Sequence, residues 1–204
     1  MLAAMILVGL TGGVASGKTT IGKMFQRCGA VLIDADKLSR EVVEPGKPAW
    51  RDIVKHFGKA VLNPDGTLNR AALGRIVFRD RAKRRRLERI IHPRVARRQA
   101  SLVKAAARNN HRAVVVYEVP LLFEAGIDQR VDHIIVVTGD RATQLSRLMR
   151  RNRLTKSEAL RRIRSQLPLA AKMAKADTVL NGTAPRRELA RRVRSLYRML
   201  RELA

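Results

Sequence analysis

The chain has 204 residues, 46% of them hydrophobic, which suffices for one globular domain with its own core. Its formal charge is +26 at pH 7, but only 3% of its residues are aromatic, so the stacking platforms of single-strand nucleic-acid binders are scarce. No stretch approaches the ~18 uninterrupted apolar residues of a membrane span, and the lone Cys28 cannot form an internal disulfide. We therefore predict a cytoplasmic protein with no membrane partner and no specific nucleic-acid partner.

Residues 12–19 form the first informative motif. Their sequence, Gly-Gly-Val-Ala-Ser-Gly-Lys-Thr, fits G-x-x-x-x-G-K-[ST], the phosphate-binding loop. The apolar run 5–10 precedes it as a buried strand, and an apolar helical stripe follows at Ile21, Met24, Phe25 and Cys28. The pattern predicts a nucleoside triphosphate site, in which Lys18 reaches the β- and γ-phosphates and the Thr19 hydroxyl holds Mg²⁺ directly.

Further apolar runs at 31–33, 113–117, 133–138 and 178–182 predict four more strands separated by helices. The expected fold is α/β, a doubly wound five-stranded parallel sheet of the P-loop NTPase type. Ligands bind outside the carboxyl ends of such strands, where the second and third strands carry Asp34-Ala35-Asp36 and Glu118.

These carboxylates have alternative roles. One aspartate can cap the next helix, expected over 37–43, which leaves the other free for chemistry. Glu118 suits a water-mediated contact with Mg²⁺ or a role in positioning the acceptor.

Residues 45–110 are expected to be helical and to bind the acceptor. Apolar stripes recur from Trp50 to Phe57 and beyond, and 63–66 is a strong turn signal. His92-Pro93 is expected to end one helix and open the next, because the residue before proline avoids the helical region.

Residues 141–175 are expected to form a short lid. Arginines gather where its first helix ends, and Thr155 with Glu158 matches a capping box that restarts a helix. A solvated basic face would explain most of these arginines but not their bunching at one helix junction. The remaining parts, 1–44, 111–140 and 176–204, form the predicted core, closed by a final helix with a leucine face.

Several stretches together resemble one family, dephospho-coenzyme A kinase. They span most of the chain in the family's order: residues 9–19, Ile33-Asp34-Ala35-Asp36, residues 40–46, Asp65-Gly66 with Leu68 and Arg70, Ile91-His92-Pro93, and Pro120-Leu121-Leu122-Phe123-Glu124. The resemblance implies transfer of the ATP γ-phosphoryl group to the ribose 3′-hydroxyl of dephospho-coenzyme A. Two positions depart from the family pattern: Ala15 stands where glycine is frequent, and Thr19 where serine is frequent.

By this resemblance Asp36 orients the acceptor hydroxyl and Arg147 is the lid arginine, so Asp36, Lys18 and Arg147 are the predicted catalytic residues. Asp34 and Glu118 are candidates for contact with Mg²⁺ through water. The predicted nucleotide-binding residues are Gly12, Gly13, Val14, Ala15, Ser16, Gly17, Lys18, Thr19, Thr20, Arg151 and Asn181.

Three other functions compete with this one. The nearest is a P-loop kinase acting on a nucleoside or nucleotide. A nucleic-acid-binding NTPase fits the charge but lacks a recognisable sensor arginine or recognition module. A GTPase switch would need Asn-Lys-x-Asp, which the sequence lacks. The oligomeric state stays open.

Overall fold

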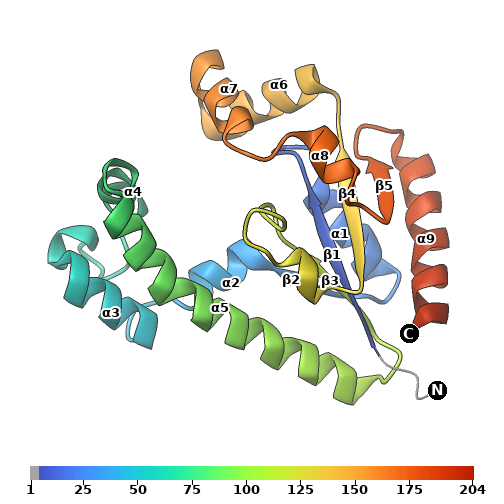
Figure 1. Cartoon of the computed structure of the whole chain (residues 1–204), viewed down its shortest axis with the longest axis horizontal. Coiled ribbons are helices and arrows are strands. Elements are labelled where there is room, and N and C mark those ends of the chain that lie inside the picture. The colour runs from blue at the N-terminus through green and yellow to red at the C-terminus, as the bar shows by residue number, and fades with distance from the viewer. Residues whose placement is uncertain (1–4) are drawn as a thin grey trace. The chain divides into compact units, whose positions relative to one another are not determined.

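The computed structural model describes residues 5–204, which divide into two compact units (Figure 1). The first unit combines the residues up to Asp34 with Val103–Ala204, and the second is Ala35–Leu102. Each unit has its own hydrophobic cluster and is described here by itself.

The first unit is built on a five-stranded parallel sheet. The strand order is β2 (Val31–Asp34), β3 (Val114–Glu118), β1 (Ile6–Gly12), β4 (His133–Thr138) and β5 (Thr178–Asn181). β1 lies at the centre and all seven of its residues are buried, as expected for a strand covered on both faces of a parallel sheet. The predicted α/β fold of the P-loop type is confirmed.

Two helices cover one face of this sheet (Figure 1). α1 (Lys18–Arg27) and α9 (Arg186–Leu203) contact each other and the strands β1 and β3. Ile21 and Phe25 of α1 and Val193 and Leu200 of α9 are fully buried in the shared core. On the opposite face, the loop after β3 brings Leu122 against Gly9.

Three further helices follow β4: α6 (Arg141–Asn152), α7 (Lys156–Arg164) and α8 (Leu169–Met173). Asp140 caps α6 through the N–H groups of Ala142 and Thr143. The capping box of α7 is confirmed, with both reciprocal bonds between Thr155 and Glu158 present. A 3₁₀ turn, η2 (Asp128–Arg130), lies between β3 and β4.

The second unit is helical. It holds α2 (Ala35–Glu41), α3 (Pro48–Phe57), the 3₁₀ turn η1 (Lys59–Val61), α4 (Arg70–Arg79) and the first part of α5 (Arg81–Asn109). Ile53 and Val61 are fully buried in its core. Two ion pairs fasten α5 inside the unit, Arg94 to Asp52 (2.5 Å) and Arg98 to Glu41 (2.7 Å).

The predicted helix break at His92-Pro93 is wrong, because α5 continues through Pro93 to Asn109. A proline inside a helix supplies no N–H to the preceding turn. Here the Arg94 guanidinium donates to the carbonyl of Ile90 in that turn (2.7 Å), and Ile90 is buried in the core of the unit. The carbonyl that loses its helical donor is that of Arg89, four residues before Pro93, so it is the packing of this part of α5 in the core that outweighs the local preference.

None of the helices within residues 5–204 combines the length and the apolar run that a bilayer crossing needs.

Candidate active site

The phosphate loop connects β1 to α1 and lies at the carboxyl end of the central strand. The Ser16 N–H donates to the Gly13 carbonyl (3.2 Å), and the Thr20 and Ile21 N–H groups donate to the Gly17 carbonyl. A Cβ at Gly12 would stand 2.1 Å from the Val137 carbonyl oxygen of β4. Only glycine fits there, because the two backbones touch.

Lys18 lies folded against its own loop. Its side chain is buried, and Nζ donates to the carbonyls of Gly13 (2.8 Å) and Gly12 (3.2 Å). Ser16 is also buried, and within residues 5–204 its Oγ has no hydrogen-bond partner. A buried polar atom without a partner is costly, so the hollow of the loop suits a polar ligand.

Thr19 and Glu118 come together at the start of α1. The Thr19 hydroxyl donates to Glu118 Oε1 (2.7 Å), and Glu118 is buried at the end of β3. Asp34 is the register partner of Glu118 on the neighbouring strand β2. Three oxygen-bearing side chains therefore gather beside the phosphate loop, which is the ligand chemistry that Mg²⁺ prefers.

Asp34 and Asp36 diverge as soon as β2 ends. Asp34 is the last residue of the strand, whereas Asp36 lies in the first turn of α2 and is exposed. The helix begins two residues earlier than the predicted 37–43. Asp34 thus belongs to the first unit and Asp36 to the second.

The other predicted site residues are exposed. Arg147 is exposed on α6, and the Arg151 side chain donates to that of its neighbour Asn152 (3.0 Å). Asn181 accepts hydrogen bonds from the Thr183 N–H and hydroxyl, so it shapes the turn after β5. Within the described chain, the phosphate-loop residues, Thr19, Glu118 and Asp34 are brought together, while nucleotide contacts of Thr20, Arg147, Arg151 and Asn181 stay predictions.

Two residues that support the loop escaped the sequence analysis. Gln144 is buried on α6, donates to the Gly139 carbonyl (3.0 Å) and would stand 3.1 Å from a Cβ at Gly13. Gly182 lies so close that a Cβ there would be 2.0 Å from the Ser16 carbonyl oxygen. No short sequence pattern marks either residue as part of the site, because its contact with the phosphate loop joins parts of the chain that are far apart in the sequence.

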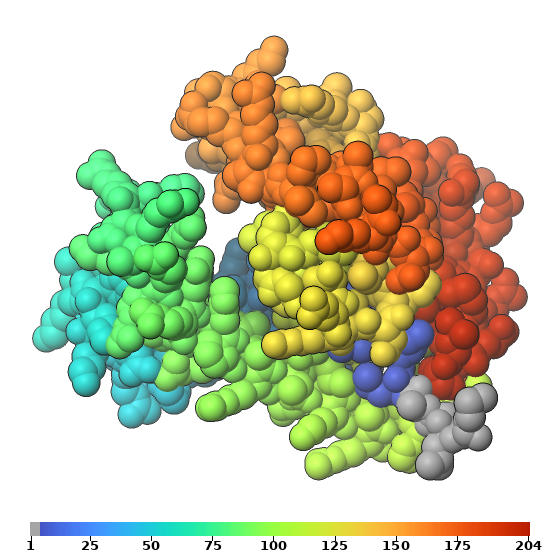
Figure 2. Space-filling model, viewed as in Figure 1, coloured from blue at the N-terminus to red at the C-terminus, as the bar shows by residue number. Residues whose placement is uncertain are grey.

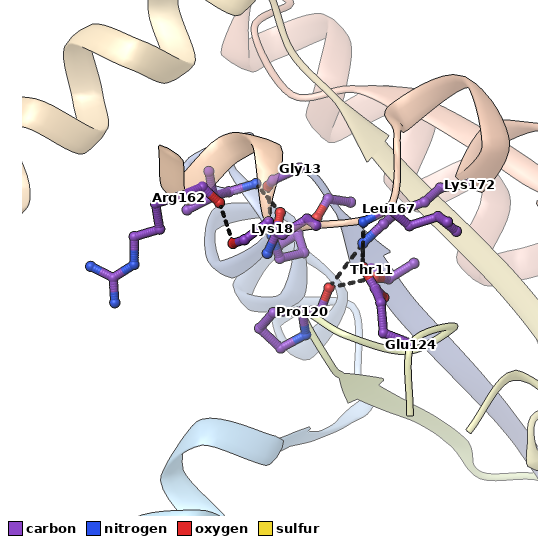
Figure 3. A network of polar contacts seen from close by, with 12 residues as sticks. Thr11, Gly13, Lys18, Pro120, Glu124, Arg162, Leu167 and Lys172 are labelled. Carbon is purple, nitrogen blue, oxygen red and sulfur yellow. Dashed lines mark hydrogen bonds and ion pairs between the residues drawn. The ribbon is translucent and has the colours of Figure 1, made fainter. Parts of the chain in front are cut away.

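A network of polar contacts joins the loop after β3 to the segment between α7 and α8 (Figure 3). Glu124 Oε1 accepts from the Leu167 N–H (2.9 Å) and from Lys172 Nζ (2.8 Å), and Lys172 is fully buried. Lys172 and the Thr11 hydroxyl both donate to the Pro120 carbonyl (3.3 Å each). The space-filling view shows the loop after β3, in yellow, against the orange-red segment around α8 (Figure 2).

Two opposing effects set the pKa of Glu124. Burial by itself would raise it, but the hydrogen bonds from Lys172 and from the Leu167 N–H outweigh burial and hold the pKa below its ordinary value of 4.5. The carboxylate therefore stays ionised beside the buried ammonium group.

Comparisons with known proteins agree on one family. The model of the family CoaE, dephospho-CoA kinase, matches residues 6–186. The dephospho-CoA kinase of Geobacter sulfurreducens is 46% identical over 193 residues, which cover 95% of this chain and 98% of the relative.

Solved structures give the same fold. The structure of TT1252 from Thermus thermophilus superposes with a TM-score of 0.82 at 31% identity and covers 98% of this chain and 99% of that one. The dephospho-CoA kinase from Campylobacter jejuni, at 22% identity and a TM-score of 0.66, covers 96% and 97% and supports the fold. With a phosphate loop of this geometry and a match over most of its length, the chain belongs to the dephospho-CoA kinase family.

Proposed function

We propose that the protein is an ATP-dependent kinase that phosphorylates the ribose 3′-hydroxyl of dephospho-coenzyme A, giving coenzyme A and ADP. The observation that carries this function is the phosphate loop with Thr19 bonded to Glu118, in a chain whose family match spans residues 6–186. The acceptor oxygen forms a bond to the γ-phosphorus, the bond from that phosphorus to the β–γ bridging oxygen breaks, and the hydroxyl proton passes to Asp36, the proposed base.

The phosphates of ATP are assigned to the loop between β1 and α1. Phosphoryl transfer depends on positioning and on neutralising charge more than on covalent help. In the structure, Lys18 Nζ donates hydrogen bonds to two loop carbonyls. The phosphates of ATP would accept stronger, charge-assisted bonds from it. Arg147 and Arg151 of α6 are the proposed lid arginines that add positive charge.

The side chains around Thr19 fit a magnesium ion. The Thr19 hydroxyl is the proposed direct ligand, while Glu118 and Asp34 would hold water molecules of the ion's shell. Bound there, Mg²⁺ would neutralise phosphate charge. Glu118 orients the Thr19 oxygen by accepting a hydrogen bond from its hydroxyl, which turns a lone pair of that oxygen outward.

Asp36 is the proposed orienter of the acceptor hydroxyl. It stands two residues after the end of β2, in the first turn of α2 and exposed. An aspartate carboxylate is a weak base at neutral pH. In a loose transition state, however, alignment of the hydroxyl matters more than early removal of its proton.

We assign acceptor binding to the helical part, residues 45–110, and the closing movement to the lid, residues 141–175. The acceptor carries a diphosphate, and the helical part offers basic surface for it. A concave surface of about 560 Å³ on α5 is lined by Arg85, Arg89 and His92 together with Glu88 and Pro93, so its basic side chains outnumber its single acidic one. A guanidinium group can donate two parallel hydrogen bonds to the oxygens of one phosphate.

A cytoplasmic location, and the absence of specific nucleic-acid or membrane partners, also belong to this proposal. Their support is the single free cysteine, Cys28, which fits a reducing compartment, and the scarcity of aromatic residues.

A substrate panel tests the function. Purified protein with ATP and Mg²⁺ is incubated with dephospho-coenzyme A, adenosine, AMP and other nucleosides, and ADP release is followed together with the mass of the product. Phosphorylation of dephospho-coenzyme A at least about a hundredfold faster than of any nucleoside or nucleotide is expected. Preference for one of these alternatives would replace the proposed function by that of a nucleoside or nucleotide kinase.

A further inference from the structure

Gln166 makes an unexpected contact with the phosphate loop. It lies between α7 and α8, and its side-chain Oε1 accepts a hydrogen bond from the Val14 N–H (3.1 Å). Val14 is the third residue of the loop, and its N–H is one of the backbone donors that such loops use around phosphates. A glutamine far along the chain thus lies at the edge of the nucleotide site.

This contact fixes which way the amide points. An N–H donor can be met only by an acceptor, so Oε1 faces Val14 and the Nε2 group points away from it. Within residues 5–204, Nε2 donates to no protein acceptor. The side chain is half-buried, and it offers two N–H donors beside the loop.

The backbone of Gln166 is held in place from its other side. The next residue, Leu167, donates to Glu124, which is paired with the fully buried Lys172. These contacts lie in the network drawn in Figure 3, and they tie the segment to the loop after β3. The segment that contains Gln166 is therefore held in position by these contacts, as is required of a side chain that binds a ligand with defined geometry.

We propose that Gln166 is a triphosphate-binding residue: Oε1 holds the Val14 N–H while Nε2 donates to a phosphate oxygen of ATP. This inference rests on the proposed function, which makes ATP the substrate of the loop. In the alternative role, Gln166 is a placeholder: its Oε1 occupies the Val14 N–H in the free protein, and the nucleotide must displace it in order to bind. The two roles predict changes of opposite sign in nucleotide affinity.

Two substitutions separate a ligand contact from a purely structural one. Gln166→Met keeps the length of the side chain and removes both its acceptor and its donors. Gln166→Glu keeps an acceptor for Val14 but replaces the two donors by a charged oxygen. A structural role predicts that Gln166→Glu resembles the wild type, whereas a phosphate contact predicts that it is the weaker binder of the two.

Ser165 offers matched controls on the same segment. It is exposed, and its hydroxyl donates to the Arg162 carbonyl (2.9 Å). Ser165→Ala controls for a small change at this point of the chain. Ser165→Asp places a negative charge one residue away and so measures the long-range effect of a carboxylate near the nucleotide.

Calorimetric titration with a non-hydrolysable ATP analogue and with ADP, in the presence of Mg²⁺, provides the measurement. Loss of a hydrogen bond to a charged group predicts about tenfold weaker binding for Gln166→Met. A larger loss is expected for Gln166→Glu, and changes within about twofold for Ser165→Ala. The loss for Gln166→Glu should also exceed that of Ser165→Asp by at least about fivefold.

Several results would overturn the proposal. Tighter binding by Gln166→Met would establish the placeholder, and affinities within twofold of the wild type for both variants would exclude the contact. An equal loss of nucleotide affinity in Gln166→Glu and Ser165→Asp would mean that the added negative charge, and not a lost hydrogen bond, weakens binding.

The titration contains no acceptor, so it is independent of the acceptor's identity. A wild-type protein that binds the analogue but leaves dephospho-coenzyme A unphosphorylated would refute the proposed function and leave Gln166 testable. A wild-type protein that binds no ATP would refute both.

Discussion

Ala15 has a backbone conformation that glycine adopts more easily than any other residue. Its φ is +58°, in the left-handed region, where a Cβ approaches the following carbonyl oxygen. By the family resemblance, Ala15 stands where glycine is frequent. In the structure, the strain of this conformation lies in a single alanine of the phosphate loop.

We expect Ala15→Gly to stabilise the folded protein by about 1 kcal/mol, because the left-handed conformation then carries no Cβ penalty. The greater backbone freedom of glycine in the unfolded chain opposes part of this gain. Chemical denaturation of the wild type and the variant measures the difference. Ala15→Val serves as the contrast, since a β-branched side chain at positive φ should destabilise the protein. A loss of stability in Ala15→Gly would contradict the assignment of strain.

The two aspartates after β2 should respond differently to loss of charge. Asp36→Asn keeps the shape of the side chain and removes the proposed acceptor of the hydroxyl proton, so kcat should fall at least about a hundredfold. Affinity for ATP should change little, because the phosphate loop is untouched. Kinetics and ATP titration of Asp34→Asn beside Asp36→Asn make the comparison. An active Asp36→Asn with an inactive Asp34→Asn would reverse the two roles.

Arg147 is exposed on α6, yet its removal is expected to act on catalysis rather than on folding. Arginine contacts to a transferring phosphoryl group are worth 10³–10⁵ in rate in the best cases, and a lid residue can supply less. We therefore expect Arg147→Ala to lower kcat at least about tenfold with an unchanged melting temperature. Arg141, exposed at the start of the same helix, gives the matched control Arg141→Ala. Turnover of Arg147→Ala within twofold of the wild type would end the assignment.

At the scale of the element, local sequence patterns correctly predicted those helices and strands whose formation depends on residues close together in the sequence. Short continuous apolar runs located all five strands, and the capping box at Thr155 located the start of α7. The expected break at Pro93 failed because a long-range environment, the core around Ile90, decides whether a proline ends a helix.

The candidate site divides in the same way. The phosphate loop could be predicted because its function lies in eight consecutive residues, and Glu118 because it ends a strand. Gln144, Gln166 and Gly182 could not, since each acts by meeting the loop across the fold. Glutamine and glycine are also too common for a single one to stand out.

The ion pair between the fully buried Lys172 and Glu124, whose side chain is 24% exposed, braces the segment between α7 and α8. Glu124→Gln leaves the fully buried ammonium group without its counter-charge, which should cost about 3 kcal/mol of stability at neutral pH. The surface pair of Glu44 and Lys47 is exposed, so Glu44→Gln should change stability by less than about 1 kcal/mol.

The pair should also make stability depend on pH. The pKa of Glu124 is lowered in the folded protein, so the stabilisation is complete above the ordinary value of 4.5 and is lost as the pH falls through the lower folded value. The melting temperatures of wild type and Glu124→Gln should therefore converge below about pH 4.5 and stay apart above it. A difference that is constant from pH 7 to pH 3 would mean that the carboxylate charge contributes nothing.

At the scale of the whole molecule, the charge of +26 is spread over exposed arginines on many helices. α9 alone carries a series of them on its outer side: Arg186, Arg187, Arg191, Arg192, Arg194, Arg198 and Arg201. Such dispersed charge attracts polyanions without selecting among them.

We expect DNA and RNA to bind without sequence preference at low salt, with an affinity that falls linearly on a log–log scale as salt rises. If about six phosphates are neutralised, the loss between 50 and 200 mM salt should be about a thousandfold. Fluorescence anisotropy with unrelated oligonucleotides measures it. Submicromolar, sequence-selective binding at physiological salt would instead assign the charge to a specific nucleic-acid partner.

The contact between Gly182 and Ser16 bears on how the protein is synthesised. The phosphate loop is translated well before β4 and the turn after β5, against which it packs. At 5–20 residues per second, roughly 160 residues of synthesis separate the loop from Gly182, a delay of about 8–30 s. ATP therefore has no finished loop to bind on the ribosome, and the apolar β1 must wait for both of its neighbours. Until those neighbours are translated, the apolar β1 has no adjacent strand to pair with, so the nascent chain must be protected from aggregation in another way.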